Sequence, residues 1–261
     1  MPRANRLSIP GQIWHITHRC HRREFLLRFA RDRRRWRHWL FQARKCFGLC
    51  MLNYVATSNH VHLLAKDQGR GEIAKSMQLI AGRTGQEYNR RKQRRGAFWE
   101  DRYHATCVDR DDYLARCMVY IDLNMVRAGA VSHPGLWEVS GFREIQQPPK
   151  RYRIIDLDGL QQLLEIDGLE RLQQTLAGWV DDAPHRGELE RDPIWSESVA
   201  VGNREFLEAC RNTAGALRHR EVDGEDGHCS LRELAPPYSV NSGRKIEHLS
   251  GENRHFLGNI R

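Results

Sequence analysis

The chain has 261 residues, of which 29% are charged and 40% hydrophobic, so it can form a packed core and is not expected to be disordered throughout. No stretch approaches the roughly 20 apolar residues of a membrane span, and the N-terminus lacks the apolar segment of a secretory signal. We therefore expect a cytoplasmic protein that does not bind membranes.

The net charge of +9 is unevenly distributed along the chain. Residues 1–150 hold 28 Lys and Arg against 13 Asp and Glu, a balance of +15, whereas residues 151–261 hold 14 against 20, a balance of −6. This asymmetry favours a first part that binds a polyanion and a second part of different character. Arginine predominates over lysine, and its planar guanidinium suits bidentate contacts with phosphate.

The first predicted element is a strand over residues 12–18, where apolar residues alternate with others. Histidines recur at every third position here, at His15, His18 and His21, with Cys20 among them. A strand would send His15 and His18 to opposite faces, so we do not expect a zinc site. The seven cysteines include no C-x-x-C pair, which favours reduced thiols.

The next elements follow from hydrophobic spacing and from turn residues. A third helix should begin at Asp109 as its N-cap, with acidic residues in its first turn. Before it come a helix over 29–47 that ends at Gly48, strands over 49–57 and 60–66 joined at Ser58-Asn59, a helix over 72–92, and a strand over 103–108.

This order of elements predicts an α+β fold of the ferredoxin-like, split βαβ type, with a trailing helix that carries the chemistry. We expect a largely antiparallel sheet with its helices on one face. Pro148-Pro149 marks the expected boundary between a domain over 1–148 and a mostly helical extension over 149–261. In that extension we expect helices over 157–166, 169–180 and 203–218, a loose acidic stretch at 224–227, and a poorly ordered tail from about residue 236.

The strand over 60–66 carries two histidines, His60 and His62, separated by one valine. Side chains alternate along a strand, so both imidazoles project to the same face and Val61 projects to the other. Two neutral imidazoles side by side form a two-point clamp for a metal ion. The alternative is a pair of strand histidines that bind nothing.

The third helix, DYLARCMVYIDLNMVRAG, carries a polar stripe at helical spacing. Tyr120 and Asn124 lie four residues apart, so both can reach one site. The hard carbonyl oxygen of Asn124 would complete a His-His-Asn set for Mg²⁺ or Mn²⁺, and Tyr120 offers a nucleophile. The alternative is a tyrosine at the core rim and a locally bonded asparagine. The stripe consists of Tyr113, Cys117, Tyr120, Asn124 and Arg127.

Several ordered motifs resemble one family. The segments PGQIWHITHRCHRREFLL, YVATSNHVHLL, SMQLIAGRTGQEYNRRKQRRGAFWEDRYHAT and YIDLNMVRAGAV are similar to those of the HUH single-tyrosine transposases, in particular the REP-associated tyrosine transposases. The resemblance covers residues 10 to about 142. The chain has Met125 where that family often has proline. The resemblance implies that His60 and His62 bind the metal, that Asn124 assists, and that Tyr120 attacks DNA.

The reaction implied by this family is nicking and rejoining of single-stranded DNA through a 5′-phosphotyrosine intermediate. Its substrates are imperfect palindromes folded into hairpins, and its cofactor is Mg²⁺ or Mn²⁺. The resemblance favours a nucleoid-associated monomer that acts in cis, although a dimer that shares its sites between chains is also open. Deleting residues 151–261 is expected to leave the chemical centre formed.

A basic segment around residues 83–95 is the predicted DNA track, and Phe98 or Trp99 is expected to stack on unpaired bases. Arginines after the first strand are expected to contact the phosphate backbone of the same DNA. The alternative for each of these charges is a solvated surface residue. The predicted DNA contacts are Arg19, Arg22, Arg23, Arg83, Arg90, Arg91, Lys92, Arg94, Arg95 and Trp99.

Two rival functions share the same fold and charge. One is a non-catalytic, domesticated protein that binds DNA hairpins, which the joint presence of His60, His62, Tyr120 and Asn124 disfavours. The other is an RNA-binding ferredoxin-like module, which would need exposed aromatic residues on its sheet in an RNP-like pattern. No such pattern is seen.

Overall fold

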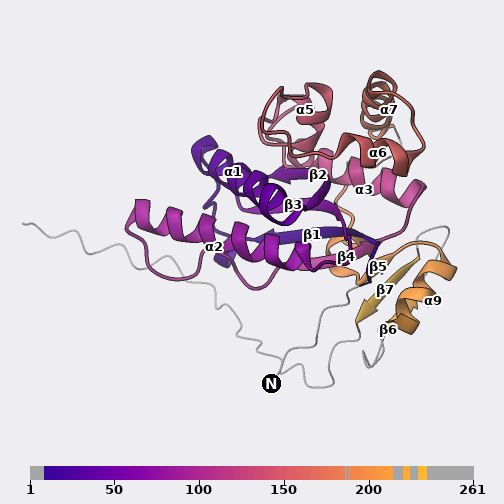
Figure 1. Ribbon diagram of the computed structural model, residues 1–261, viewed down its shortest axis with the longest axis horizontal. Helices are drawn as coiled ribbons and strands as arrows, with labels where there is room; N and C mark the ends of the chain where they lie inside the picture. Colours follow the sequence, from indigo (N-terminus) through magenta and orange to yellow (C-terminus); the bar gives the residue numbers. More distant parts are fainter. Residues whose placement is uncertain (1–8, 186, 188, 214–219, 224–228, 234–261) are drawn as a thin grey trace, which may run out of the picture.

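The computed structural model describes residues 9–213 except 186 and 188, together with 220–223 and 229–233 (Figure 1). The predicted tail from residue 236, the acidic stretch at 224–227 and the end of the predicted helix over 203–218 lie outside these residues. Among the described residues, no helix combines the length and the hydropathy needed to cross a membrane.

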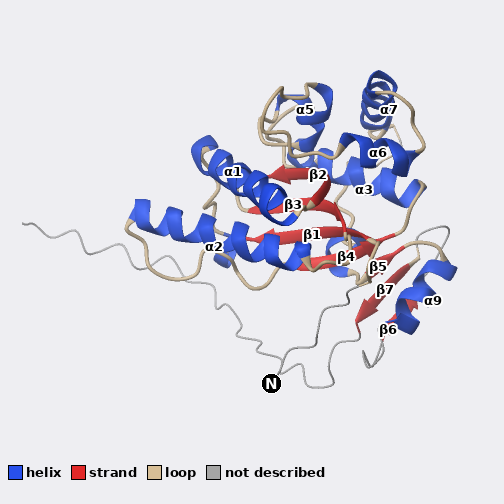
Figure 2. Ribbon diagram, viewed as in Figure 1, coloured by secondary structure: helices blue, strands red, loops and turns tan. Residues whose placement is uncertain are grey.

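A seven-stranded sheet forms the centre of the molecule, in the order β2-β3-β1-β4-β5-β7-β6 (Figure 2). The first four of these strands pair antiparallel, in the arrangement that the split βαβ fold predicts, and β4 pairs parallel with β5. The strands are β1 Ile13–Arg19, β2 Cys50–Ala56, β3 His60–Lys66, β4 His104–Val108, β5 Ala200–Val201, β6 Arg220–Asp223 and β7 Ser230–Glu233.

The helices cover both faces of the sheet, so the expectation that they lie on one face is wrong. The side chain of Asn53 in β2 donates a hydrogen bond to Asp122 of α3, whereas the next residue, Tyr54, packs its ring against Trp36 of α1. Helices α1 and α2 lie side by side across the second face (Figure 1). The helices are α1 Ala30–Phe47, α2 Glu72–Lys92, α3 Asp112–Asp122, α4 Asn124–Arg127, α5 Gly141–Gln146, α6 Leu157–Leu164, α7 Leu169–Asp182, α8 Ile194–Glu197 and α9 Arg204–Thr213.

The predicted third helix is interrupted at Leu123, which separates α3 from α4. Near this interruption the carbonyl of Tyr120 accepts a hydrogen bond from the Arg127 guanidinium, and the amide of Leu123 donates to the carbonyl of Val119. The helix does not begin at Asp109. The Asp109 carboxylate instead accepts from the amides of Arg110 and Asn203, and Asp111 occupies the N-cap position.

Residues after the expected boundary at 148 continue the same structure. Strands β5, β7 and β6 extend the sheet, helix α6 contacts β2, and α8 contacts β4. The three strands were not expected, because segments of two to four residues are too short to show an alternating pattern. One hydrophobic core cluster includes residues from both sides of residue 148, and the division into two domains stays a prediction.

Register places the two histidines of β3 on the face that α3 covers. His62 pairs with Thr17 on one side and Val55 on the other, and His60 pairs with Arg19. Paired residues of antiparallel strands point to the same face, so His62 lies on the same side as Asn53, which bonds to α3. Val61 and Leu63 point the other way and are fully buried.

We predict that Gly141→Ala destabilises the protein by about 1–3 kcal/mol. A Cβ at this first residue of α5 would collide with the Asn53 side chain and lie 2.8 Å from the backbone nitrogen of Tyr54. The control is Gly178→Ala in α7, where an added Cβ has nothing within 4 Å. That control should raise helix propensity and stability by up to about 1 kcal/mol. Equal urea midpoints for the two variants would contradict this packing.

Candidate active site

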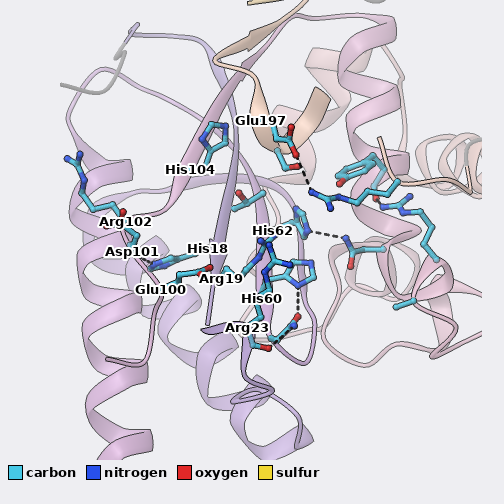
Figure 3. Close-up of a pocket in the computed structure, with 18 residues that line it drawn as sticks. His18, Arg19, Arg23, His60, His62, Glu100, Asp101, Arg102, His104 and Glu197 are labelled. Atoms are coloured by element: carbon cyan, nitrogen blue, oxygen red, sulfur yellow. Dashed lines mark hydrogen bonds and ion pairs between the residues drawn. The ribbon is translucent and has the colours of Figure 1, made fainter. Parts of the chain in front are cut away.

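A cavity of about 730 Å³ opens on the α3 face of the sheet (Figure 3). Its walls come from β1, β3, the segment that leads into β4, the end of α3 with α4, and the extension around α8. His60, His62, Tyr120 and Asn124 all line it. The structure therefore brings the four sequence-predicted site residues together, all from one chain.

The hydrogen bonds of His60 assign its tautomer. Its Nδ1 lies 2.7 Å from Asn59 Oδ1 and 3.0 Å from Thr57 Oγ1. The Asn59 amide nitrogen donates to the carbonyl of Arg23, so the other amide atom is an oxygen and can only accept. Nδ1 of His60 must therefore carry the proton, which leaves Nε2 with a lone pair.

His62 reaches the same tautomer through a chain of three groups. The ring nitrogen Nδ1 of His15 lies 2.8 Å from the main-chain carbonyl of Trp195, which can only accept, so this nitrogen donates. Neutral His15 then accepts at Nε2, which lies 2.9 Å from Nδ1 of His62. The proton in this bond belongs to His62 Nδ1, and Nε2 of His62 keeps its lone pair.

Burial keeps these rings neutral. Burial lowers the pKa of His15 to about 3. Burial, together with nearby Arg19 and Arg191, lowers the pKa of His60 to about 4. Burial also holds the pKa of His62 well below its usual value. Neutral imidazoles are the form that binds metal ions, so the charge state at neutral pH suits the predicted role.

Asn124 completes the donor set that the sequence predicts. Its side-chain nitrogen lies 3.0 Å from Nε2 of His62, where it donates to the lone pair of that nitrogen. A rotation of this amide would present Oδ1 in its place. Two imidazole nitrogens and one amide oxygen are ligands that Mn²⁺ and Mg²⁺ accept. Within the described part of the chain, no three His, Cys, Asp or Glu side chains gather to hold a metal ion.

Tyr120 lies beside the histidines in the last turns of α3. Its ring centroid is 5.9 Å from that of His62 and 6.0 Å from that of His15, with the rings edge to face. The side chain is 8% exposed, and burial raises the pKa of its phenol, whereas Arg127 and Arg191 lower it. The Arg127 guanidinium lies 4.3 Å from the Tyr120 ring centroid. The hydroxyl group is thus close to cations in a partly dry site.

The predicted DNA contacts divide into two groups. Arg19 and Arg23 line the cavity, and Arg22 is exposed between them. The predicted contacts in α2 and in residues 93–95 after it are not among the residues that line the cavity. Arg90 and Arg91 line a separate cavity of about 430 Å³ between α1 and α2. This second group consists of Arg83, Arg90, Arg91, Lys92, Arg94 and Arg95.

Two arginines of the second group, and the two predicted stacking residues, already have contacts within the protein. Arg91 forms an ion pair with Asp32, and Arg94 forms one with Glu24. Trp99 stacks on His18 with a centroid separation of 4.2 Å, and its indole nitrogen donates to the carbonyl of Ala81. Phe98 is buried. The proposed base-stacking role of Phe98 and Trp99 would therefore require both to leave these contacts.

Sequence reasoning missed His15, Trp195 and Arg191 as site residues. His15 was considered only for a zinc site, although strand alternation already placed it on one face with Thr17 and Arg19. Its approach to His62 depends on the register of β1 against β3, which local pattern does not reveal. Trp195 lies 180 residues away from its partner His15, and Arg191 lines the cavity from the extension. No local signal in the sequence identifies either residue.

One protein family matches the first part of the chain. Residues 9–124 match the family model described as IS200-like transposase, which confirms the resemblance drawn from the sequence motifs. No curated protein matches the chain.

Two solved structures are similar in part. A REP-associated tyrosine transposase bound to a REP hairpin is 18% identical with a TM-score of 0.47, over 60% of this chain and 94% of that chain. A candidate transposase from Deinococcus radiodurans R1 is 13% identical with a TM-score of 0.33, over 49% and 92%. Both TM-scores lie below 0.5.

We predict that the free energy of unfolding falls as the pH drops from 6.5 towards 4 in metal-free buffer. The unfolded chain binds a proton at His60 near pH 6.5, whereas the folded chain resists it down to about pH 4. His60 should contribute up to about 1.4 kcal/mol per pH unit in this window. Urea unfolding at pH 7 and pH 5 should therefore show a smaller loss of stability in His60→Gln than in the wild type. An identical loss in both proteins would show that His60 is not held neutral.

Proposed function

We propose that the protein is a metal-dependent single-stranded DNA transesterase, on the basis that residues 9–124 match the family model of IS200-like transposases. One observation carries the proposal. A single cavity holds the Tyr120 phenol next to two neutral imidazoles whose tautomers leave both Nε2 atoms unprotonated. A phenol beside two imidazole nitrogens that are free to bind a metal ion suits metal-assisted phosphoryl transfer to tyrosine.

In the proposed reaction, Tyr120 Oη attacks the phosphorus of a scissile phosphate. The new bond joins the phenolic oxygen to the 5′ phosphate, and the bond from phosphorus to the 3′ oxygen breaks. The phenol loses its proton and the departing 3′ oxygen gains one. A 3′ hydroxyl can later attack the phosphotyrosine and reverse the step, which joins strands without ATP.

His60, His62 and Asn124 would hold Mg²⁺ or Mn²⁺. When bound, the ion would polarise a non-bridging phosphate oxygen and so compensate for a nucleophile whose usual pKa is about 10. The protein contributes rigidity here, because the histidine tautomers are fixed by Asn59 on one side and by His15 on the other.

Arginines at the cavity would stabilise the negative charge of the phosphate. Within the described residues, Nη1 of Arg127 is buried without a hydrogen-bond partner, so it is available to a phosphate oxygen. The same guanidinium donates to the carbonyl of Tyr120, which ties the cation to the nucleophile. Arg19 and Arg191 also line the cavity and lower the pKa of His60. Guanidinium groups bind phosphate with two parallel hydrogen bonds.

Substrate and assembly follow from the family resemblance of the YIDLNMVRAG and NHVHLL motifs. We expect single-stranded DNA that carries imperfect-palindrome hairpins, bound by a monomer acting in cis. One chain supplies every proposed catalytic group, which supports action in cis. The alternative is a domesticated, non-catalytic binder of DNA hairpins, and the low exposure of Tyr120, at 8%, favours it in one respect.

We predict that the wild type forms a covalent adduct with single-stranded hairpin DNA from the flanks of its own gene when Mg²⁺ or Mn²⁺ is present. Tyr120→Phe should lose the adduct and at least a hundred-fold of the nicking rate, because its ring keeps the packing but has no nucleophilic oxygen. Tyr113→Phe, on the same helix, is the matched control and should react as the wild type does. Denaturing gels and intact-protein mass spectrometry measure both products.

Undiminished cleavage by Tyr120→Phe would place the nucleophile elsewhere. Tight binding without cleavage, across both metals and several flanking sequences, would support the domesticated binder. Cleavage that persists in a chelator would contradict the role of the metal.

A further inference from the structure

The hydrogen-bond chain behind His62 reaches into the extension. We propose that His15, held by the main-chain carbonyl of Trp195, is a positioning residue that fixes His62 for metal binding. The inference rests on the proposed function, because it concerns the proposed metal ligand. His15 is fully buried, and its ring plane lies within 7° of that of His62 with a centroid separation of 5.1 Å. The two rings are therefore held edge to edge by the bond between their nitrogens.

The hydrogen bonds from His62 through His15 all donate in one direction, because the last group, the Trp195 carbonyl, can only accept. A carbonyl only accepts, so it orders the protons of both histidines and leaves Nε2 of His62 facing the cavity with its lone pair. Without His15, the proton of neutral His62 could move to Nε2, where it would block a metal ion. Partners behind a metal-binding histidine typically change metal affinity ten- to a hundred-fold when they are removed.

The Trp195 carbonyl has one further polar neighbour, whose shorter hydrogen bond goes to another residue. Thr106 in β4 donates towards the Trp195 carbonyl at 3.2 Å and towards the carbonyl of Ser198 at 2.7 Å. Trp195 is buried, and its ring centroid lies 6.1 Å from that of Tyr120. Segment 194–198 thus contacts both the metal-binding side and the nucleophile side of the site. The expectation that removal of residues 151–261 leaves the centre formed does not agree with these contacts.

Three variants test the positioning role. His15→Leu removes both hydrogen bonds, whereas His15→Gln keeps an acceptor for His62 and a donor for the Trp195 carbonyl. Thr106→Val is the matched control, because it also loses a bond to Trp195 but touches no proposed ligand. Thermal unfolding establishes that each variant is folded. Mn²⁺ affinity, measured by calorimetry without DNA, and the ¹⁵N shifts of the His62 ring in the metal-free protein are the readouts.

We expect His15→Leu to weaken Mn²⁺ binding at least ten-fold and to redistribute the His62 ring proton, while His15→Gln recovers most of both and Thr106→Val changes neither. Wild-type Mn²⁺ affinity and an unchanged Nδ1–H signal in His15→Leu would overturn the proposal. If Mn²⁺ does not bind even the wild type, the proposed function fails. In that case the ¹⁵N shifts of the His62 ring, compared between the wild type and His15→Leu, still test whether His15 fixes the His62 tautomer.

A different observation concerns the loop between β1 and α1. Phe25 and Phe29 are 65% and 58% exposed, although the residues between them are anchored. Leu26 and Leu27 are buried, and the amide of Leu27 donates to the carbonyl of Ser58. Two largely exposed aromatic rings, four residues apart, therefore lie on an anchored loop.

The surroundings of these rings indicate the partner. The cations of Arg28 and Lys92 lie 5.9 and 5.5 Å from the Phe29 ring centroid. Arg23, two residues before Phe25, lines the active-site cavity, and its carbonyl is bonded by Asn59. Basic groups next to exposed aromatic rings suit single-stranded DNA, whose bases stack while its phosphates pair with cations.

We infer that Phe25 and Phe29 stack on unpaired bases of the DNA strand where it leaves the cavity past Arg23. This inference rests on the proposed function and assigns the base-stacking role to residues other than the predicted Phe98 and Trp99. Bases stack on aromatic side chains, so loss of both rings should weaken binding at least ten-fold.

The test uses Tyr120→Phe protein, so that binding is measured without cleavage. The probe is a hairpin with a single-stranded flank that contains 2-aminopurine. Phe25→Ser with Phe29→Ser should lower its affinity at least ten-fold and abolish the fluorescence quench, with little effect on duplex DNA. Tyr152→Ser, at another exposed aromatic residue, is the control. Unchanged affinity and quench would overturn the inference. The two outcomes are independent. If the double variant loses affinity but the wild-type protein never cleaves DNA, the stacking role is upheld and the proposed catalysis fails.

Discussion

The site depends on the pleat of β3, which points His60 and His62 to the sheet face that α3 covers. Val61 and Leu63 fill the core on the other face, so a shift of register by one residue would bury the wrong side chains and remove both imidazoles from the cavity. The same pleat aligns His15 diagonally beside His62. The same strand register therefore determines both the packing of the central sheet and the geometry of the candidate site.

Neutrality of the buried histidines links the fold to the chemistry. Burial removes the charged form of these rings, and acceptors at both ends of the histidine row decide where the remaining protons lie. The cations Arg19, Arg127 and Arg191 line the same cavity and also disfavour a positive charge on His60. Neutral rings keep lone pairs available to a metal ion, while the arginines remain available to phosphate. The acidic extension belongs to this arrangement, because it supplies the carbonyl of Trp195 and the side chain of Arg191.

Local periodicity and spacing predicted the four central strands and the first three helices. The family resemblance, rather than local periodicity, implied that His60, His62, Tyr120 and Asn124 act together, and the structure places all four at one cavity. Helical spacing also held across the interruption at Leu123, since the chain stays helical on both sides. Coverage of both sheet faces, the strands of the extension and the His15–Trp195 contact were not predictable. They are set by long-range packing, by strands too short for a pattern, and by register.

The most direct measurement is the anomalous X-ray signal of crystals grown with Mn²⁺. We expect one strong peak within coordination distance of Nε2 of both His60 and His62, with Asn124 turned to present its oxygen and the Tyr120 hydroxyl facing the ion. Manganese bound elsewhere, or a Tyr120 hydroxyl turned away from both rings with no neighbouring chain to replace it, would contradict the central claim.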